Sequence, residues 1–330
     1  MKKYTLAFLI LIVVLSLFIV PTIASSTIYL SVNGVKVTSD NCSDILKDGT
    51  TSYDPATKTL TLNNATISEA SNYSVNGVSY SACIANLDEL KINLIGNNTI
   101  SVGDSYEHVR LNRVGIYLNE DLSIIGSGTL TITEWRESDY GICAKSLTID
   151  KATVDATNSE VGIWLLGNNP LTVKSGSITA RGNSCAMKIG ALDLSDYSNH
   201  AIAIGTSEED AVLCYNRLTA EQISNSKYIR IGPGLSLRLE PVENGDFQVK
   251  VVNDANLPIS AALLIAAYND SGKMINVKMN SISCLANSSA KAQDYTPPVG
   301  YSTVKAFLLD PIDHIPICIF QQHVKNNPYR

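Results

Sequence analysis

Residues 147–180 read LTIDKATVDATNSEVGIWLLGNNPLTVKSGSITA. Within them a series of three short alternating segments occurs once, and the same series then starts a second time. Leu147-Thr148-Ile149 opens the first copy and Leu171-Thr172-Val173 opens the second. Each triplet alternates apolar, polar and apolar side chains, which predicts a short strand with one buried face. Such a strand buries its apolar face by stacking on its own copies, so the pattern predicts a repeat protein.

The opening triplet occurs six times, and the steps between its first leucines are 30, 32, 25, 24 and 21 residues. A second element precedes it and a third follows it in the same order. Three short strands in constant order predict a parallel β-helix, because a β-sandwich has no reason to repeat three elements in sequence. The six triplets are Leu60-Thr61-Leu62, Leu90-Lys91-Ile92, Leu122-Ser123-Ile124, Leu147-Thr148-Ile149, Leu171-Thr172-Val173 and Leu192-Asp193-Leu194.

The segments around the repeats predict a cap at one end and a second domain at the other. Val32-Asn33-Gly34-Val35 is typical of a tight turn between two strands, and Asp44-Ile45-Leu46-Lys47 predicts a short helix. Thr219 and Gln222 have the spacing of a helix capping box. We therefore expect the β-helix with its N-terminal cap to occupy residues 25–232.

From Leu235 onward, apolar runs recur about every ten residues, separated by turns such as Asn269-Asp270-Ser271-Gly272. This pattern predicts an antiparallel β-sandwich of immunoglobulin-like or fibronectin-like shape over residues 235–330. The runs expected to form strands are 235–239, 247–252, 261–268, 274–279, 303–309 and 316–320.

The first 24 residues predict export. Lys2 and Lys3 precede an uncharged apolar run from Tyr4 to Val20, and small residues end at Ala24, which is typical of a cleaved signal peptide. An uncleaved membrane anchor is the alternative, since a membrane span needs about 20 apolar residues. We expect a secreted protein, either free or associated with the cell surface, with no transmembrane domain in the mature chain.

Net charge limits the classes of binding partner that we expect, and cysteine spacing bears on disulfide formation. The chain carries a formal charge of -6 without any basic cluster, so nucleic acid is not an expected partner. An anionic polysaccharide would need a bridging cation. The seven widely spaced cysteines do not form a dense, even-numbered disulfide scaffold, and we interpret them as small apolar residues that fill gaps, with one exported disulfide as the alternative.

Several stretches resemble known surface proteins. Val32-Asn33-Gly34-Val35 through Tyr53-Asp54-Pro55 and residues 56–67, with the later Gly-Ile elements and Gly-Ser-Gly-Thr-Leu-Thr-Ile at 126–132, are similar to the carbohydrate-binding-type β-helix regions of surface proteins from anaerobic Gram-positive bacteria. The tail piece 304–310 with Pro316-Ile317-Cys318 resembles the sandwich module that often closes such proteins. The resemblance implies a right-handed helix, an extracellular location and polysaccharide binding with calcium.

The second elements of successive repeats predict a binding face. The residue after their buried Ile or Met is Ala85, Tyr117, Cys143, Trp164 or Lys188, and alternation places all five on the outer side of stacked strands. Aligned aromatic faces are what sugar rings stack on. The expected ligand-binding residues are Tyr117, Trp164 and Lys188, extended by Trp135 and Tyr140 on the neighbouring loop.

Metal binding and catalysis have weaker signals. Glu134, Asp139 and Asp155 lie at turns or strand ends where oxygen ligands could hold calcium, although each is also a common turn or surface residue. A group of Arg110, Arg113 and Arg136 with nearby acids is the one candidate for catalysis. The alternative is a solvated loop.

Three function classes stay open at this point. The sequence favours a non-catalytic polysaccharide-binding protein that uses an exposed face of the β-helix. The first alternative is a structural or adhesive surface protein with a rod-like solenoid and a docking sandwich that contacts a cell-wall component. The second is a pectin-type polysaccharide lyase or hydrolase, which the β-helix architecture suggests without supplying a catalytic signature.

Overall fold

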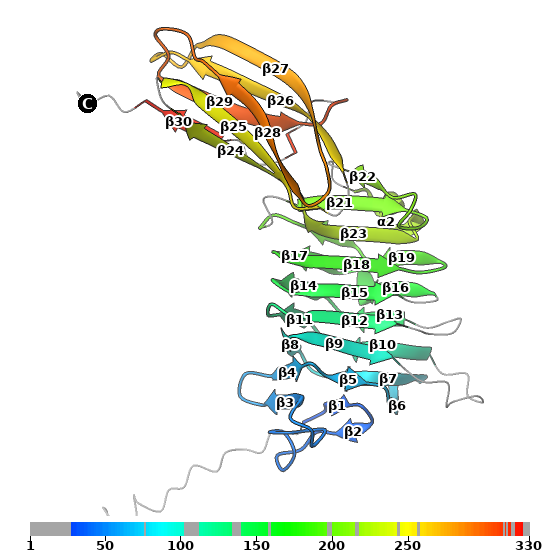
Figure 1. Cartoon of the computed structure of the whole chain (residues 1–330). Coiled ribbons are helices and arrows are strands. Elements are labelled where there is room, and N and C mark those ends of the chain that lie inside the picture. Colours follow the sequence, from blue (N-terminus) through cyan, green and yellow to red (C-terminus); the bar gives the residue numbers. More distant parts are fainter. Residues whose placement is uncertain are drawn as a thin grey trace, which may run out of the picture.

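The computed structural model describes residues 28–75, 77–101, 112–133, 140–157, 160–196, 200–214, 218–242, 245–255, 258–312, 314, 316–317 and 321–325. The chain is all-β, with parallel and antiparallel sheets, as predicted (Figure 1). Two short helical segments accompany the strands, η1 (Leu166–Asn168) and α2 (Ala220–Asn225). No helix among these residues is long and apolar enough to cross a bilayer.

Three sheets, numbered I to III here, form the first part of the chain, and most of their strands run parallel. Sheet I contains β1 (Ser31–Val32), β2 (Val35–Lys36), β6 (Ser71–Val75), β7 (Val78–Asn86), β10 (Asn112–Leu118), β13 (Tyr140–Ala144), β16 (Val161–Leu165) and β19 (Cys185–Lys188). Sheet II contains β3 (Thr51–Asp54), β4 (Thr59–Asn63), β8 (Leu90–Ile95), β11 (Leu122–Ile125), β14 (Leu147–Asp150), β17 (Pro170–Val173) and β20 (Ala191–Asp193). Sheet III contains β5 (Thr66–Ile67), β9 (Asn97–Ser101), β12 (Thr129–Thr133), β15 (Thr153–Thr157), β18 (Ser177–Arg181), β21 (His200–Gly205), β22 (Val212–Cys214) and β23 (Tyr228–Pro233).

From β7 to β20 the chain visits sheets I, II and III in turn and repeats that order. Each strand pairs in parallel with its equivalents one repeat away, and the predicted triplets lie in register. Leu122 is opposite Leu90 on one side and Leu147 on the other, and Leu171 is opposite Leu147. The first triplet is an exception, because Leu60 lies opposite Ile92 and not Leu90. A shift of two residues keeps the alternation, so Leu60 and Leu62 still face inward.

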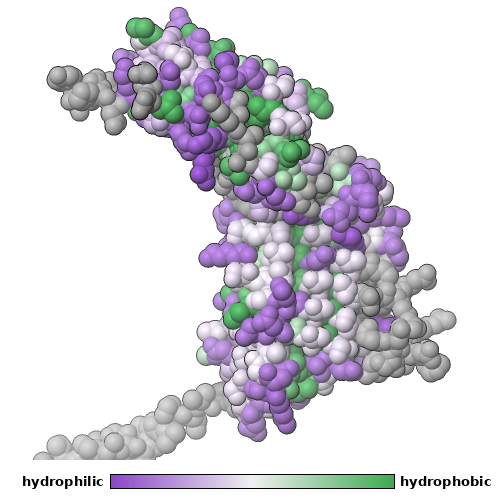
Figure 2. All heavy atoms as spheres, viewed as in Figure 1, coloured by the Kyte–Doolittle hydropathy of each residue, from purple (hydrophilic) through white to green (hydrophobic). Residues whose placement is uncertain are grey.

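One side of each of the three sheets contributes apolar residues to a shared core. Leu122, Ile142 and Val154, one from each sheet, are members of it and are almost completely buried. The outer residues of sheet III are mainly Thr and Ser, and Figure 2 shows that face largely in the pale colours of such residues. The inward and outward sides of sheets II and III are therefore those that the alternation predicted.

A column of glycines brings two sheets close together. Gly115, Gly141 and Gly162 lie in the adjacent strands β10, β13 and β16. A Cβ atom at Gly141 would lie 2.5 Å from the carbonyl oxygen of Gly162, and one at Gly162 would lie 2.6 Å from the carbonyl oxygen of Ala156 in sheet III. Only glycine fits where backbones approach this closely.

Both ends of the three-sheet stack change strand direction. The predicted tight turn is confirmed, since β1 and β2 pair antiparallel and Asn33 and Gly34 have positive φ angles of 51° and 76°. The helix predicted at 44–47 is wrong: those residues form turns, and Asp44 Oδ1 accepts backbone hydrogen bonds from Asp48 (3.2 Å) and Gly49 (3.1 Å). At the other end the predicted capping box is confirmed at the start of α2.

Two antiparallel sheets follow at the far end of the stack (Figure 1). They share a second hydrophobic core, to which Phe247, Leu263 and Val304 belong, and Ala201 of β21 also packs against it. Pro316 forms an isolated bridge with Leu309, and residues 318–320 of the last predicted strand lie outside the described residues. Sheet IV contains β24 (Leu235–Pro241), β25 (Phe247–Asn253) and β28 (Ser288–Tyr295), and sheet V contains β26 (Ile259–Tyr268), β27 (Met274–Cys284), β29 (Thr303–Leu309) and β30 (Gln321–Val324).

Candidate functional site

The column predicted from the second elements exists in sheet I. Tyr117 of β10 lies opposite Ala85 of β7 and Cys143 of β13. Cys143 lies opposite Trp164 of β16, and Trp164 lies opposite Lys188 of β19. The five residues are therefore in register on five adjacent strands.

The outer side of this sheet carries its own hydrophobic cluster, separate from the core between the sheets. We call it the outer cluster. Its buried members are Tyr80, Ala82, Ala85, Val114, Tyr117 and Cys143, and Tyr140, Trp164 and Leu166 pack against it while partly exposed. Val114 and Tyr117 both belong to the outer cluster although they are three residues apart in β10. Strict alternation would place them on opposite faces, and Gly115 lies at the irregularity between them.

The prediction that Tyr117 is exposed is wrong. Its side chain is only 2% exposed, because the Tyr80 ring lies against it with ring centroids 4.6 Å apart, and Cys143, opposite it on β13, is fully buried. Burial, followed by the nearby Tyr80 and Cys143, raises the pKa of Tyr117 to about 12. Tyr117 is a packing residue of the outer cluster.

The accessible part of the column is its other end. Tyr140 and Trp164 are each half-buried, and their rings pack with centroids 4.8 Å apart and planes tilted by 45°. Lys188 is exposed on the adjacent strand. Trp135 lies outside the described residues. The structure thus brings together three of the five predicted ligand-binding residues in accessible positions: Tyr140, Trp164 and Lys188.

Sequence reasoning missed Tyr80, which shields Tyr117. The signal was its position two residues before Ala82-Cys83-Ile84, which extends β7 by the residues that reach the Tyr117 ring. A cavity of about 300 Å³ next to Ala85, at the buried end of the column, was also not predicted. Tyr29, Asn72, Asn86 and Leu87 are among the residues that line it.

Of the metal and catalytic candidates, the structure describes only Asp155 and Arg113. Asp155 lies on the outer side of sheet III between Thr131 and Thr179, and it accepts a hydrogen bond from Thr157 Oγ1 at 2.9 Å. Glu134, Asp139, Arg110 and Arg136 lie outside the described residues, and Arg113 is part of β10. Within the part of the chain that the structure describes, no three His, Cys, Asp or Glu side chains are placed to hold a metal ion.

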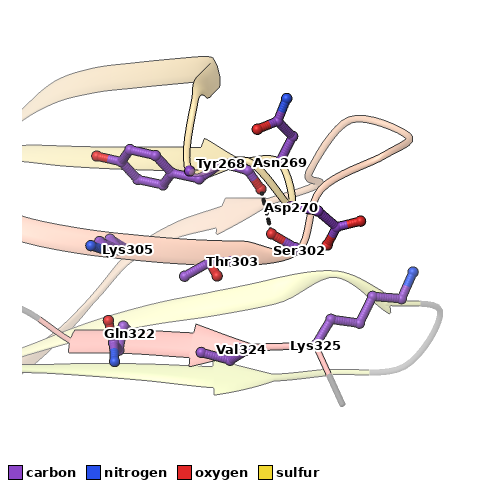
Figure 3. Close-up of a pocket in the computed structure, with 10 residues that line it drawn as sticks. Tyr268, Asn269, Asp270, Ser302, Thr303, Lys305, Gln322, Val324 and Lys325 are labelled. Atoms are coloured by element: carbon purple, nitrogen blue, oxygen red, sulfur yellow. Dashed lines mark hydrogen bonds between the residues drawn. The ribbon is translucent and has the colours of Figure 1, made fainter. Parts of the chain in front are cut away.

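A second open cavity, of about 610 Å³, lies on sheet V (Figure 3). Tyr268, Thr303, Lys305 and Gln322 contribute its walls, together with the turn after β26. The Lys305 ammonium lies 5.1 Å above the centroid of the Tyr268 ring. Since lysine already covers that ring face, this cavity offers a sugar less aromatic surface than the Tyr140 and Trp164 pair does.

Comparison with known proteins identifies the first part of the chain. The model of the carbohydrate-binding domain-containing protein family matches residues 42–212, which include most of the three-sheet stack and the whole column from Ala85 to Lys188. This chain belongs to that family. The match covers just over half of the sequence and leaves out the two antiparallel sheets. No curated protein matches.

Solved structures add little. The β-glucuronidase 2 of Bacteroides uniformis, covalently bound to cyclophellitol-6-carboxylate aziridine, is 15% identical and gives a TM-score of 0.21. A calcium-binding mutant of that enzyme is 14% identical with a TM-score of 0.21, and a further B. uniformis β-glucuronidase structure is 16% identical with a TM-score of 0.20. The alignments cover 31% of this chain and only 15 to 16% of those chains, so nothing about activity follows from them.

Proposed function

We propose that this chain is a secreted or cell-surface polysaccharide-binding protein without catalytic activity. Family membership supports a carbohydrate ligand. We further propose that sheets I, II and III form a right-handed parallel β-helix over residues 25–232 after a signal peptide of residues 1–24, and that residues 235–330 form an immunoglobulin-like or fibronectin-like sandwich. The repeated order of the sheets and their parallel register support the β-helix.

The sugar site in this proposal is the accessible end of the outer cluster. The observation that carries it is the half-exposed ring pair of Tyr140 and Trp164 beside Lys188. The apolar C–H faces of sugar rings stack on such aromatic surfaces, and an ammonium group donates hydrogen bonds to sugar hydroxyls. Tyr117 lies buried in the same cluster two strands away and does not contact the ligand.

Affinity electrophoresis in gels that contain single polysaccharides tests the site. Replacing Trp164 by Ala removes the larger ring, and we expect the dissociation constant to rise at least about fivefold, since an aromatic contact that buries its ring contributes on the order of 1 kcal/mol or more. Trp164→Phe retains a ring and should lose less affinity. Thr172→Ala, on the outer side of sheet II, is the control that should not change migration. Unchanged retardation of Trp164→Ala by every bound polysaccharide would contradict the site.

A further inference from the structure

β27 is the outermost strand of sheet V and is unusually long. It runs over Met274–Cys284 and pairs with β26 along one edge. No other strand among the described residues pairs with its second edge. A long edge strand presents a row of backbone N–H and C=O groups to any strand that can approach, and proteins usually shorten or cover such edges.

An ordinary surface strand places apolar residues on the core side of its sheet and polar residues on the outward side, and β27 shows the opposite arrangement. Asn276 and Asn280 are opposite the core residues Ala267 and Leu263, so they share the core side of sheet V. They are held there by polar partners of β28: Tyr295 Oη donates to Asn276 Oδ1 at 2.9 Å, and Asn280 hydrogen-bonds Gln293. Asn276 and Asn280 therefore have hydrogen-bond partners on β28, and the exposed Lys278 lies between them on the same side.

The outward side of β27 is apolar and open. Ile275, Val277 and Met279 are 37%, 49% and 52% exposed. The register continues this surface across the sheet, because Met279 lies opposite Leu264, which lies opposite Phe307, and both are half-buried. Figure 2 shows apolar residues at the surface of this part of the molecule. Contiguous exposed apolar surface on a soluble protein usually marks an interaction site.

We propose that β27 pairs antiparallel with β27 of a second copy of this chain, around a twofold axis at Val277. In this register Val277 faces its own copy, and Ile275 faces Met279, so the open apolar residues of both chains become cross-strand neighbours. Lys278 faces Asn276. The register thus brings the exposed apolar residues of both strands together and keeps the two Lys278 side chains from facing each other.

Neighbouring registers lack this complementarity. An axis at Lys278 places two lysines directly opposite each other, which is destabilising. An axis at Asn276 places Met274 opposite Lys278 and Lys273 opposite Met279. An antiparallel pair around one axis also uses up the exposed edge of both chains, so the product is a closed dimer and not a filament. The opposite edge of sheet V, β30, has only four residues.

Analytical ultracentrifugation of the purified protein tests the proposal, which does not depend on carbohydrate binding. We expect twice the monomer mass at micromolar concentration. Val277→Lys places two ammonium groups at the axis and removes apolar contact, so the dimer dissociation constant should rise at least about tenfold. Ser283→Lys adds the same charge to the same outward side of β27 away from the axis and should leave the dimer intact. Circular dichroism checks that both variants fold.

Cysteine crosslinking fixes the register. Val277→Cys places two thiols at the axis, where antiparallel partners have Cα atoms about 4.5 to 5.5 Å apart, within the range of a disulfide. We expect an oxidised dimer on a non-reducing gel, absent from the wild type. Ser283→Cys should give none, because its two copies would be about 40 Å apart. A wild-type protein that stays monomeric at tens of micromolar overturns the proposal, as does a dimer that Val277→Lys does not weaken.

Discussion

Asn98 is a polar side chain in the core of the stack, and hydrogen bonds to the backbone satisfy it. It lies in the column of Leu130, Val154 and Ile178 and is only 2% exposed. Its Oδ1 accepts from the backbone N–H of Ala65 at 2.9 Å, and its Nδ2 donates to the carbonyl oxygens of Ile95 (3.2 Å) and Thr129 (3.1 Å). The side chain therefore joins three successive repeats.

Replacing Asn98 by Leu should destabilise the protein even though leucine suits the column. The change leaves buried backbone groups without partners, and each such group costs about 1–3 kcal/mol. Urea unfolding should show a lower midpoint. Asn97→Ala is the matched control at the adjacent, exposed position and should shift the midpoint much less. If Asn98→Leu is as stable as the wild type, Asn98 is not a structural link.

The strands of the three-sheet stack could be predicted because their sequence pattern repeats. Segments that do not follow the repeat were harder to predict. The in-register triplets and the inward residues followed directly from the period-2 pattern. The turns at 44–49 were missed because a single side chain, Asp44, caps the backbone there, and local sequence reads the same residues as a helix. β28 was missed because its sequence SSAKAQDY has little apolar alternation.

Gly141→Ala tests how closely β13 must approach its neighbours. The new Cβ would lie 2.5 Å from the Gly162 carbonyl oxygen and 3.3 Å from Ala156 Cβ. Neighbouring strands must move apart, which we expect to cost about 1–3 kcal/mol of unfolding free energy. Thr148→Ala on the outer side of sheet II should cost less. Equal denaturation midpoints for the two variants would show that the stack relaxes freely at this column.

The sequence predicted which residues of the candidate site lie in register, but not which of them are exposed to solvent. Solvent exposure depends on how the whole chain packs. One sequence shows that Tyr117 and Trp164 lie on the same side of a sheet. It does not show that the Tyr80 ring covers one of them while the other remains half-exposed, because that depends on packing between strands far apart in the chain. The same limit applies to the acidic candidate Asp155, whose neighbours in the stack are threonines.

The buried ionisable groups predict a loss of stability at alkaline pH. Burial raises the pKa of the Cys83 and Cys143 thiols, and of the Tyr117 phenol, to about 12 in the folded chain, from ordinary values of 9.0 and 10.0. The folded state therefore holds these protons more tightly than the unfolded state does. This stabilisation is complete below about pH 9 and is lost as pH rises from about 9 to 12.

Thermal unfolding followed between pH 7 and pH 11 under reducing conditions measures this effect. The transition temperature should be nearly constant up to about pH 8.5 and then fall. A Cys83→Ala, Cys143→Ala double variant should fall less steeply, because two of the three groups are gone. A double variant with the same alkaline slope as the wild type would assign the loss to other residues.

The strands of the stack lie across its long direction, so their backbone hydrogen bonds point along it (Figure 1). A pulling force applied between the two ends of the stack would load these bonds one repeat after another and not all at once. Proteins whose repeats contact only their neighbours open in this way, by local steps. Under mechanical tension the stack is therefore expected to peel repeat by repeat at modest force and to extend, absorbing a sudden load before the remaining repeats are disturbed.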